Sequence, residues 1–411
     1  MTKLTRRTPH ARLVTGAMAC LLTFACAGGP QADVGPLAPR GAMPVGFSIG
    51  IRTEMRDFDF NKEGAPRAVR AIADRTIDML ALSGGGAGGA YGAGVLVGLT
   101  NAGTRPRFEI VTGVSTGALI APFAFLGSDW DRKLTEAYGG EATDKLMQAR
   151  GLGVLFDVGV FDGKPLRDLV ERFVTEELVF AVAREAANGR MLLVATTNLD
   201  REETVLWDMG AIARRGGPQA RDLFRQVLVA SASVPGVFPP VMIEVEKDGE
   251  TFKEMHVDGG ASTPFFIATE SLMHLDKAAA SLRGANVYVI INGQVASAPR
   301  STSNNTLDIA ARSFTSVLNQ MTRTAILQTD DFARQNSLGY RFSGIPSDVE
   351  FGGSLAFDKV HMSATFDYGM RCATRGQVWL TEELAAARMR EEADLKPFAE
   401  ADCPLIPRKS G

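Results

Sequence analysis

The feature that most constrains this chain is a serine between two glycines, in the stretch Gly113-Val114-Ser115-Thr116-Gly117. An apolar run typical of a buried strand (108–112) precedes it, and an apolar run typical of a helix (118–126) follows. A serine on such a sharp strand-to-helix turn needs small neighbours, because a side chain at either glycine would clash with the backbone. The turn exposes the hydroxyl at the positive end of the helix dipole. This context favours a nucleophilic Ser115 over a capping serine on an ordinary turn.

A second glycine-rich stretch, residues 83–89, lies between a predicted strand (77–82) and a predicted helix (90–102). Consecutive glycines let backbone amides turn toward one point without obstruction by Cβ atoms. Such a point binds a phosphate or the oxyanion of an acyl-transfer intermediate. The predicted donors are the amides of Gly84, Gly85, Gly86, Gly88 and Gly89.

The same glycines also satisfy the dinucleotide-binding spacing, with Gly84, Gly86 and Gly89 at the three fixed positions. That function requires an acidic residue at the end of the next strand, to bind the ribose. The next strand ends in the serine turn, and its Glu109 lies at the opposite end. We therefore prefer an oxyanion hole and expect no nucleotide and no cofactor.

A nucleophilic serine needs a base, and Asp258 is the main candidate. It ends a predicted strand and precedes Gly259 and Gly260, although an Asp-Gly turn is the common alternative. An ordinary carboxylate, with a pKa near 4, is a weak base for a hydroxyl, so a Ser115–Asp258 pair requires a desolvated pocket. The histidines that could serve instead are His256, His274 and His361, and a Ser-His-Asp triad would use His361.

Four blocks thus occur in order: the glycine loop, the serine turn, residues 231–240 (SASVPGVFPP) and Asp258-Gly259-Gly260. Together they resemble the patatin-like phospholipase family, from residue 84 to residue 260. The resemblance implies a Ser115–Asp258 dyad without histidine, an oxyanion hole in the glycine loop and hydrolysis of lipid acyl esters, of the phospholipase A or lysophospholipase type. It also implies a sheet sandwiched between helices and a lipid or phospholipid substrate.

One position departs from that family. Many members carry Arg or Lys inside the glycine loop, where this chain has Gly88, and this weakens the case for a phospholipid headgroup. Residues 231–240 are expected to shape the acyl pocket or simply to stop a helix. Residues 151–163 are expected to form either a lid or a packed loop. The alternatives to the dyad enzyme are a Ser-His-Asp esterase using His361 and a non-catalytic envelope lipoprotein.

Strands that alternate with helices predict an α/β fold with a mainly parallel sheet. One patatin-like catalytic domain is expected at residues 75–381, since no repeat or strong linker interrupts it. Its strands are predicted at 77–82, 108–112, 191–197, 203–207, 241–245, 251–257 and 287–291, with a hairpin at Asp248-Gly249. Its helices are predicted at 90–102, 118–126, 166–187, 220–232 and 307–338, the last being one long helix or two shorter ones.

The N-terminus has the pattern of a signal peptide (1–25), with four basic residues before a short apolar run. Cys26 is a candidate lipidation site, the Gly/Pro/Ala-rich run to about residue 44 predicts a flexible tether, and 26–74 is assigned to an N-terminal extension. We expect an exported protein, periplasmic or anchored in the outer membrane as a lipoprotein, in peripheral contact with the membrane. Cys372 and Cys403 could then form a disulfide, the second in a C-terminal extension (382–411).

Charge and histidine content exclude two further classes of protein. Removing the signal leaves 40 basic residues against 47 acidic ones, which disfavours a nucleic-acid partner. The chain has four scattered histidines and no Cys-x-x-Cys pair, so no metal site is expected.

Overall fold

The computed structural model describes residues 35–47, 50–59, 76–139, 142, 162–267, 284–295, 301–304, 306–380 and 395–405. The predicted signal peptide, Cys26, His274 and nearly all of the predicted lid lie outside these ranges, as does much of the C-terminal extension. In the described part of the chain, no helix combines the length and the apolar character needed to cross a bilayer.

Parallel strands form the centre of the sheet, in the spatial order β5-β4-β3-β9-β10. In β3 (Asp78–Leu82), Leu80 and Leu82 pack in the apolar cluster on one face, and Met79 and Ala81 pack in the cluster on the other. A strand buried on both faces reads as a continuous apolar run, which is why the sequence pattern found it. The other central strands are β4 (Ile110–Val114), β5 (Met191–Asn198), β9 (Asn286–Gln294) and β10 (Gly339–Ile345).

The rest of the sheet is antiparallel, so the sheet as a whole is mixed. β5 pairs with β6 (Glu203–Asp208) and with β8 (Glu250–Asp258), and β8 forms the predicted hairpin with β7 (Val241–Lys247). The predicted parallel arrangement therefore holds for the five central strands. The antiparallel pairing with β5 places the end of β8 beside the carboxyl end of β4 and β5, where ligands bind in open α/β sheets.

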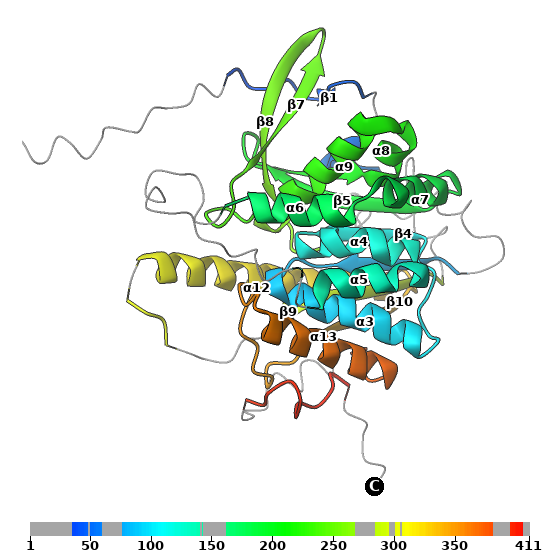
Figure 1. The fold of residues 1–411 in the computed structure, drawn as a ribbon, viewed down its shortest axis with the longest axis vertical. Coiled ribbons are helices and arrows are strands. Elements are labelled where there is room, and N and C mark those ends of the chain that lie inside the picture. The colour runs from blue at the N-terminus through cyan, green and yellow to red at the C-terminus, as the bar shows by residue number, and fades with distance from the viewer. Residues whose placement is uncertain are drawn as a thin grey trace, which may run out of the picture. The chain divides into compact units, whose positions relative to one another are not determined.

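Helices cover both faces of the sheet, which confirms the predicted α/β sandwich (Figure 1). One face packs against the larger group of helices, and α12 (Thr306–Gln335) packs on the other through Ile326 and Phe332. The larger group comprises α3 (Gly89–Asn101), α4 (Thr116–Leu126), α5 (Asp131–Tyr138), α6 (Lys164–Phe173), α7 (Glu176–Ala187), α8 (Met209–Arg215), α9 (Gly217–Ser231) and α13 (Lys359–Thr374).

Some elements differ from the sequence prediction. The helix predicted at 166–187 is two helices, because Thr175 adopts an extended conformation and its side chain accepts a hydrogen bond from the amide of Leu178, capping α7. Of the two alternatives left open for residues 307–338, the structure has the single long helix, α12. The strand β10 was not predicted, because only four of its residues are buried and its glycines and serine weaken the apolar pattern.

Parts of both predicted extensions, 26–74 and 382–411, contact the predicted catalytic domain. Ala38 and Ala42 are fully buried, and β1 (Met43–Pro44) and β2 (Arg52–Glu54) pair with β7 and β6, so the tether predicted to about residue 44 ends before Ala38. These edge strands are too short to show a sequence pattern. At the other end, a disulfide joins Cys372 of α13 to Cys403, with Cα atoms 5.4 Å apart.

Candidate functional site

Ser115 lies on a strained turn between β4 and α4. Its backbone has φ 55° and ψ −127°, a conformation that residues with a side chain rarely adopt. A Cβ atom at Gly113 would lie 2.6 Å from the carbonyl oxygen of Gly117, and one at Gly117 would lie 2.3 Å from that of Leu82. Both glycines are therefore required by close backbone approach. The turn places the Ser115 hydroxyl at the N-terminal end of α4.

The structure brings Ser115 and Asp258 into direct contact. The Oγ of Ser115 donates a hydrogen bond to Oδ2 of Asp258 at 2.5 Å. The second carboxylate oxygen, Oδ1, accepts a hydrogen bond from the amide of Gly260 at 2.7 Å. Both side chains are buried, and Asp258 comes from the last position of β8. Residues 143 positions apart thus form one hydrogen-bonded unit.

Burial changes the acidity of Asp258. Removal from water raises its pKa to about 7, although the hydrogen bonds from Ser115 and Gly260 act in the opposite direction. The desolvated pocket that a Ser-Asp pair requires is therefore present. A base is most effective when its pKa lies near the working pH, because it is then both available and strong enough to take a proton.

The glycine loop, residues 83–89, packs directly against Ser115. A Cβ atom at Gly84 would lie 3.2 Å from the Cβ of Ser115. Three of the five predicted donors already have acceptors inside the protein: Gly84 donates to Pro264, Gly88 to Gly85, and Gly89 to Gly86 and Ala87.

The other two amides of the loop, those of Gly85 and Gly86, donate to no other residue within the described ranges. Neither position has room for a side chain, since a Cβ at Gly85 would lie 1.7 Å from the carbonyl oxygen of Asn292, and one at Gly86 would lie 2.1 Å from that of Ser354. These two amides are the available donors for an oxyanion.

Comparison with known proteins agrees with this geometry. Residues 80–269 match the family described as patatin-like phospholipase. The chain carries a patatin-like phospholipase domain. The matched range contains the glycine loop, Ser115, residues 231–240 and Asp258, which confirms the resemblance predicted from these four blocks, and it indicates a lipid acyl hydrolase.

No curated protein matches the chain. Among solved structures, the chain is similar to VipD from Legionella pneumophila, with 13% sequence identity and a TM-score of 0.38 over 77% of this chain and 70% of VipD.

The side chain of Ser231 is hydrogen-bonded to the turn that carries Ser115. Its hydroxyl accepts a hydrogen bond from the amide of Ser115 at 3.0 Å and donates one to the carbonyl of Ala195 at 2.7 Å. The carbonyl of the nearby Ser233 accepts a hydrogen bond from the amide of Asp258 at 2.9 Å. The start of the segment 231–240 is thus hydrogen-bonded to both Ser115 and Asp258. The sequence analysis did not predict these contacts.

Asn292, at the end of β9, holds the glycine loop. Its backbone N–H donates a hydrogen bond to Oγ of Ser83 at 2.9 Å, and its side-chain Nδ2 donates one to the carbonyl of Ser83 at 2.6 Å. Asn292 is completely buried. It lies outside the matched range of the patatin-like domain, and no motif in the sequence marked it.

The histidines within the described ranges, His256 and His361, form hydrogen bonds with residues other than Ser115 and Asp258. Nε2 of His361, near the start of α13, accepts a hydrogen bond from the amide of Gly352 at 2.8 Å. His256 is completely buried on β8, where Nδ1 pairs with Thr196 Oγ1 at 2.9 Å and Nε2 with Glu254 Oε2 at 3.1 Å. Neither is hydrogen-bonded to Ser115 or Asp258.

Glu109, the acidic residue considered for binding the ribose of a nucleotide, lies at the far end of the central strands from the glycine loop. Oε2 of Glu109 accepts a hydrogen bond from the amide of Asp78, the first residue of β3, at 2.8 Å. The glycine loop follows the other end of β3, so Glu109 is at the opposite edge of the sheet. Among the described residues, no cluster of three or more His, Cys, Asp or Glu side chains could hold a metal ion.

Proposed function

We propose that the domain hydrolyses acyl esters of lipids through a Ser115–Asp258 dyad and an acyl-serine intermediate, as a phospholipase A or lysophospholipase does. The observation that carries this proposal is the 2.5 Å hydrogen bond from Ser115 to a buried carboxylate whose pKa is raised to about 7. A hydroxyl becomes a useful nucleophile when an adjacent base of suitable pKa takes its proton.

In the first half of the reaction, Asp258 accepts the proton of Ser115 while Oγ attacks the ester carbonyl. The tetrahedral intermediate collapses, the ester C–O bond breaks, and the leaving alcohol takes the proton from Asp258. In the second half, water gives a proton to Asp258 and attacks the acyl-serine. The fatty acid then leaves as Ser115 recovers its proton.

The oxyanion in both halves is assigned to the amides of Gly85 and Gly86, which have no acceptor among the described residues. A backbone donor of this kind is worth about 3–4 kcal/mol when it is removed from a dry site. The N-terminal end of α4 adds a favourable dipole at the same place. Since all these donors belong to the backbone, the absence of a basic side chain at Gly88 does not remove them.

The deciding experiment is a hydrolysis panel of short p-nitrophenyl esters, phospholipids and lysophospholipids. Ser115→Ala and Asp258→Asn are each expected to lower kcat by on the order of a thousandfold or more. Ser115→Ala should also abolish labelling by a fluorophosphonate. Ser363→Ala is the matched control, because the hydroxyl of this serine on α13 donates to the carbonyl of Gly139. This variant is expected to retain full activity.

The same panel tests the two alternatives. His361→Gln is expected to retain activity, because His361 Nε2 already accepts the amide of Gly352. A loss of activity as large as that of Asp258→Asn would favour the Ser-His-Asp esterase. Failure of wild-type protein to hydrolyse any ester or to react with the fluorophosphonate would favour a non-catalytic lipoprotein.

We further propose that the protein is exported and works at a membrane surface. The basic and apolar pattern of residues 1–25 and the buried Cys372–Cys403 disulfide support an oxidising compartment. Anchoring through lipid on Cys26 would keep the enzyme close to its substrate. Mass spectrometry of the mature N-terminus, from membrane and soluble fractions, tests both cleavage and lipidation.

A further inference from the structure

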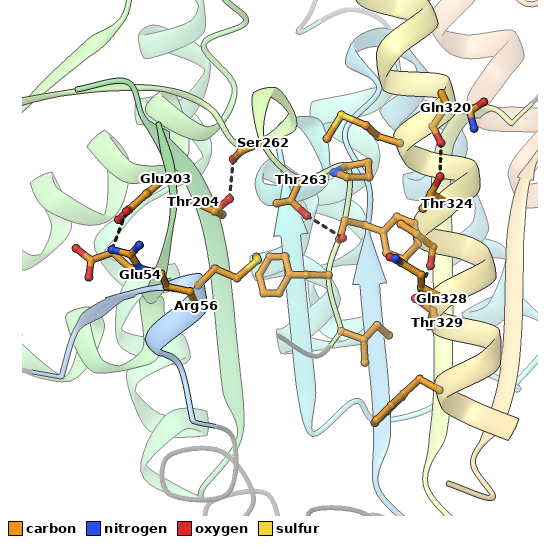
Figure 2. A pocket seen from close by; sticks show the side chains of 18 of the residues that line it. Glu54, Arg56, Glu203, Thr204, Ser262, Thr263, Gln320, Thr324, Gln328 and Thr329 are labelled. Atoms are coloured by element: carbon orange, nitrogen blue, oxygen red, sulfur yellow. Dashed lines mark hydrogen bonds and ion pairs between the residues drawn. The ribbon is translucent and has the colours of Figure 1, made fainter. Parts of the chain in front are cut away.

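Three hydroxyl groups form a chain of hydrogen bonds that ends at Asp258, the proposed base. Thr204, near the start of β6, donates to Oγ of Ser262 at 2.7 Å, and Figure 2 shows this contact between the two side chains. Oγ of Ser262 lies 2.7 Å from Oγ1 of Thr197 on β5. Oγ1 of Thr197 donates to the backbone carbonyl of Asp258 at 2.9 Å. The chain therefore connects β6 and β5 to the last residue of β8.

Ser262 is the central member of this chain. A hydroxyl has a single proton to donate, and Thr204 and Thr197 donate theirs to Ser262 and to the carbonyl of Asp258. The proton between Ser262 and Thr197 therefore comes from Ser262, for which the carbonyl of Gly259 is a longer alternative acceptor at 3.4 Å. Hydrogen bonds in such a chain polarise one another, so loss of the central hydroxyl weakens the others.

Ser262 also closes the turn that orients the carboxylate of Asp258. The short helix η5 (Gly259–Ala261) follows Asp258, and the amide of Ser262 donates to the carbonyl of Gly259 at 3.1 Å. Within this turn, the amide of Gly260 donates to Oδ1 of Asp258 at 2.7 Å. The hydroxyl of Ser262 thus attaches to β5 and β6 the turn that carries a donor to the base.

The amide of Gly260 affects how readily Asp258 ionises. Burial raises the pKa of Asp258 to about 7, and the hydrogen bonds from Ser115 and Gly260 act to lower it. A hydrogen bond to the ionised carboxylate stabilises that form, so displacement of the Gly260 amide raises the pKa further. On β8, the side chains of His256 and Glu254 pair with each other and not with Asp258.

We propose that Ser262 is a positioning residue for the base of the reaction. Its hydroxyl attaches η5 to β5 and β6, which keeps the amide of Gly260 on Oδ1 of Asp258. Oδ2 then remains directed at the hydroxyl of Ser115. The inference rests on the proposed Ser115–Asp258 dyad and adds the contact that keeps its base in place.

The first test is the pH profile of Ser262→Ala on a soluble p-nitrophenyl ester. The pKa that limits kcat/KM is expected to rise by about 0.5–1, so that kcat/KM near pH 6 falls about threefold to tenfold. The level at high pH should stay within about twofold, because the ionised base is then fully available in both proteins. A role in folding alone would lower kcat/KM equally at every pH. An unchanged pKa, or the lower pKa that entry of water would produce, would overturn the proposal.

Two further variants separate the hydroxyl of Ser262 from its surroundings. Thr263→Val is the matched control, because it removes a neighbouring buried hydroxyl that donates to the carbonyl of Phe265 at 3.1 Å. Its pH profile is expected to match that of the wild type. Ser262→Thr keeps the hydroxyl and is expected to recover most of the activity that Ser262→Ala loses near pH 6. An equal shift in Thr263→Val and Ser262→Ala would overturn the proposal.

Direct titration of Asp258 separates this inference from the proposed function. Carboxyl-carbon NMR of protein labelled at its aspartates, with Asp258→Asn to assign the signal, measures the pKa without any ester. If the wild type hydrolyses no ester but Ser262→Ala still raises this pKa, the proposed function fails and the positioning of the carboxylate stands. If the wild type is active and the pKa of Asp258 is the same in both proteins, only the positioning role is overturned.

Discussion

The hydroxyl of Ser231 accepts a hydrogen bond from the backbone amide of Ser115 at 3.0 Å. Because it also donates to Ala195, it fixes the strained turn relative to β5. Ser231→Ala is expected to lower kcat by about tenfold to a hundredfold with little change in KM, since small displacements of a nucleophile are costly. Steady-state kinetics on a soluble ester measures both constants.

The matched control for this prediction is Ser233→Ala. That hydroxyl is equally buried, but it donates only to the carbonyl of Val229, four residues earlier. Its removal should leave kcat within about twofold of wild type. An equal loss in both variants would show that packing at the end of α9, rather than the position of Ser115, limits the rate.

The pH dependence of hydrolysis follows from the pKa of Asp258. The reaction needs the ionised carboxylate, and burial raises this pKa to about 7. We therefore expect kcat/KM to fall about tenfold per pH unit below about pH 7 and to be level above it. Measurement across pH, with enzyme returned to neutral pH to check recovery, separates titration from denaturation. A profile that stays level down to about pH 5 would contradict a base of this pKa.

Asn292 offers a test of the glycine loop from outside the matched domain. Asn292→Ala removes the hydrogen bond to the carbonyl of Ser83 and is expected to lower kcat, because the amides of Gly85 and Gly86 lose their fixed position. Asn286→Ala is the control, since Asn286 lies at the other end of β9 and its side chain donates to Asp78. If both variants lose activity equally, the effect belongs to the strand and not to the loop.

The local parts of the site could be predicted from the sequence. The turn at Ser115 could be predicted from the glycines two positions before and after it, between two apolar runs, and Asp258 from its place at a strand end before Gly259. Ser231 and Asn292 could not be found in this way, because a buried serine or asparagine has no local signature. Ser231 acts through a contact with Ser115, which lies 116 positions away, and Asn292 through a contact with Ser83, which lies 209 positions away.

The same distinction applies to the fold. The buried central strands show continuous apolar runs, whereas β1 and β2 are too short to show any period. β1 pairs with β7, and β2 pairs with β6 and carries Arg52, which forms a long-range ion pair with Glu254 on β8. The parallel strands β3, β4, β5 and β9 were predicted and β10 was not, and antiparallel pairing was visible only where an Asp-Gly turn marked the hairpin.

The ion pair between Arg52 and Glu254 is expected to stabilise the folded protein. Burial alone would raise the pKa of Glu254, but hydrogen bonds from His256 and Arg52 lower it to about 2. Arg52→Met would leave a buried carboxylate without its main partner and is expected to reduce the free energy of unfolding by about 3–5 kcal/mol. Adding Glu254→Gln should recover much of that loss. Chemical denaturation at neutral pH measures each step.

The pH dependence of this pair has a definite sign. Because the pKa of Glu254 is lower in the folded protein, its stabilising contribution is present above the ordinary value of 4.5 and is lost as pH falls toward about 2. The Arg52→Met variant should lose less stability on acidification than wild type. Parallel acid unfolding curves for the two proteins would contradict the assignment.

The Cys372–Cys403 disulfide fixes the described end of the chain to α13. Tyr368 and Arg371 of the same helix also bind this segment, through the carbonyls of Asp402 and Phe398. Replacing both cysteines by serine is expected to lower the free energy of unfolding by about 2–4 kcal/mol, chiefly because the unfolded chain gains freedom. Reductant should lower the denaturation midpoint of the wild type and leave that of the double variant unchanged. A midpoint that reductant does not shift in the wild type, with free thiols detected by alkylation, would show that the two cysteines are unpaired in the folded protein.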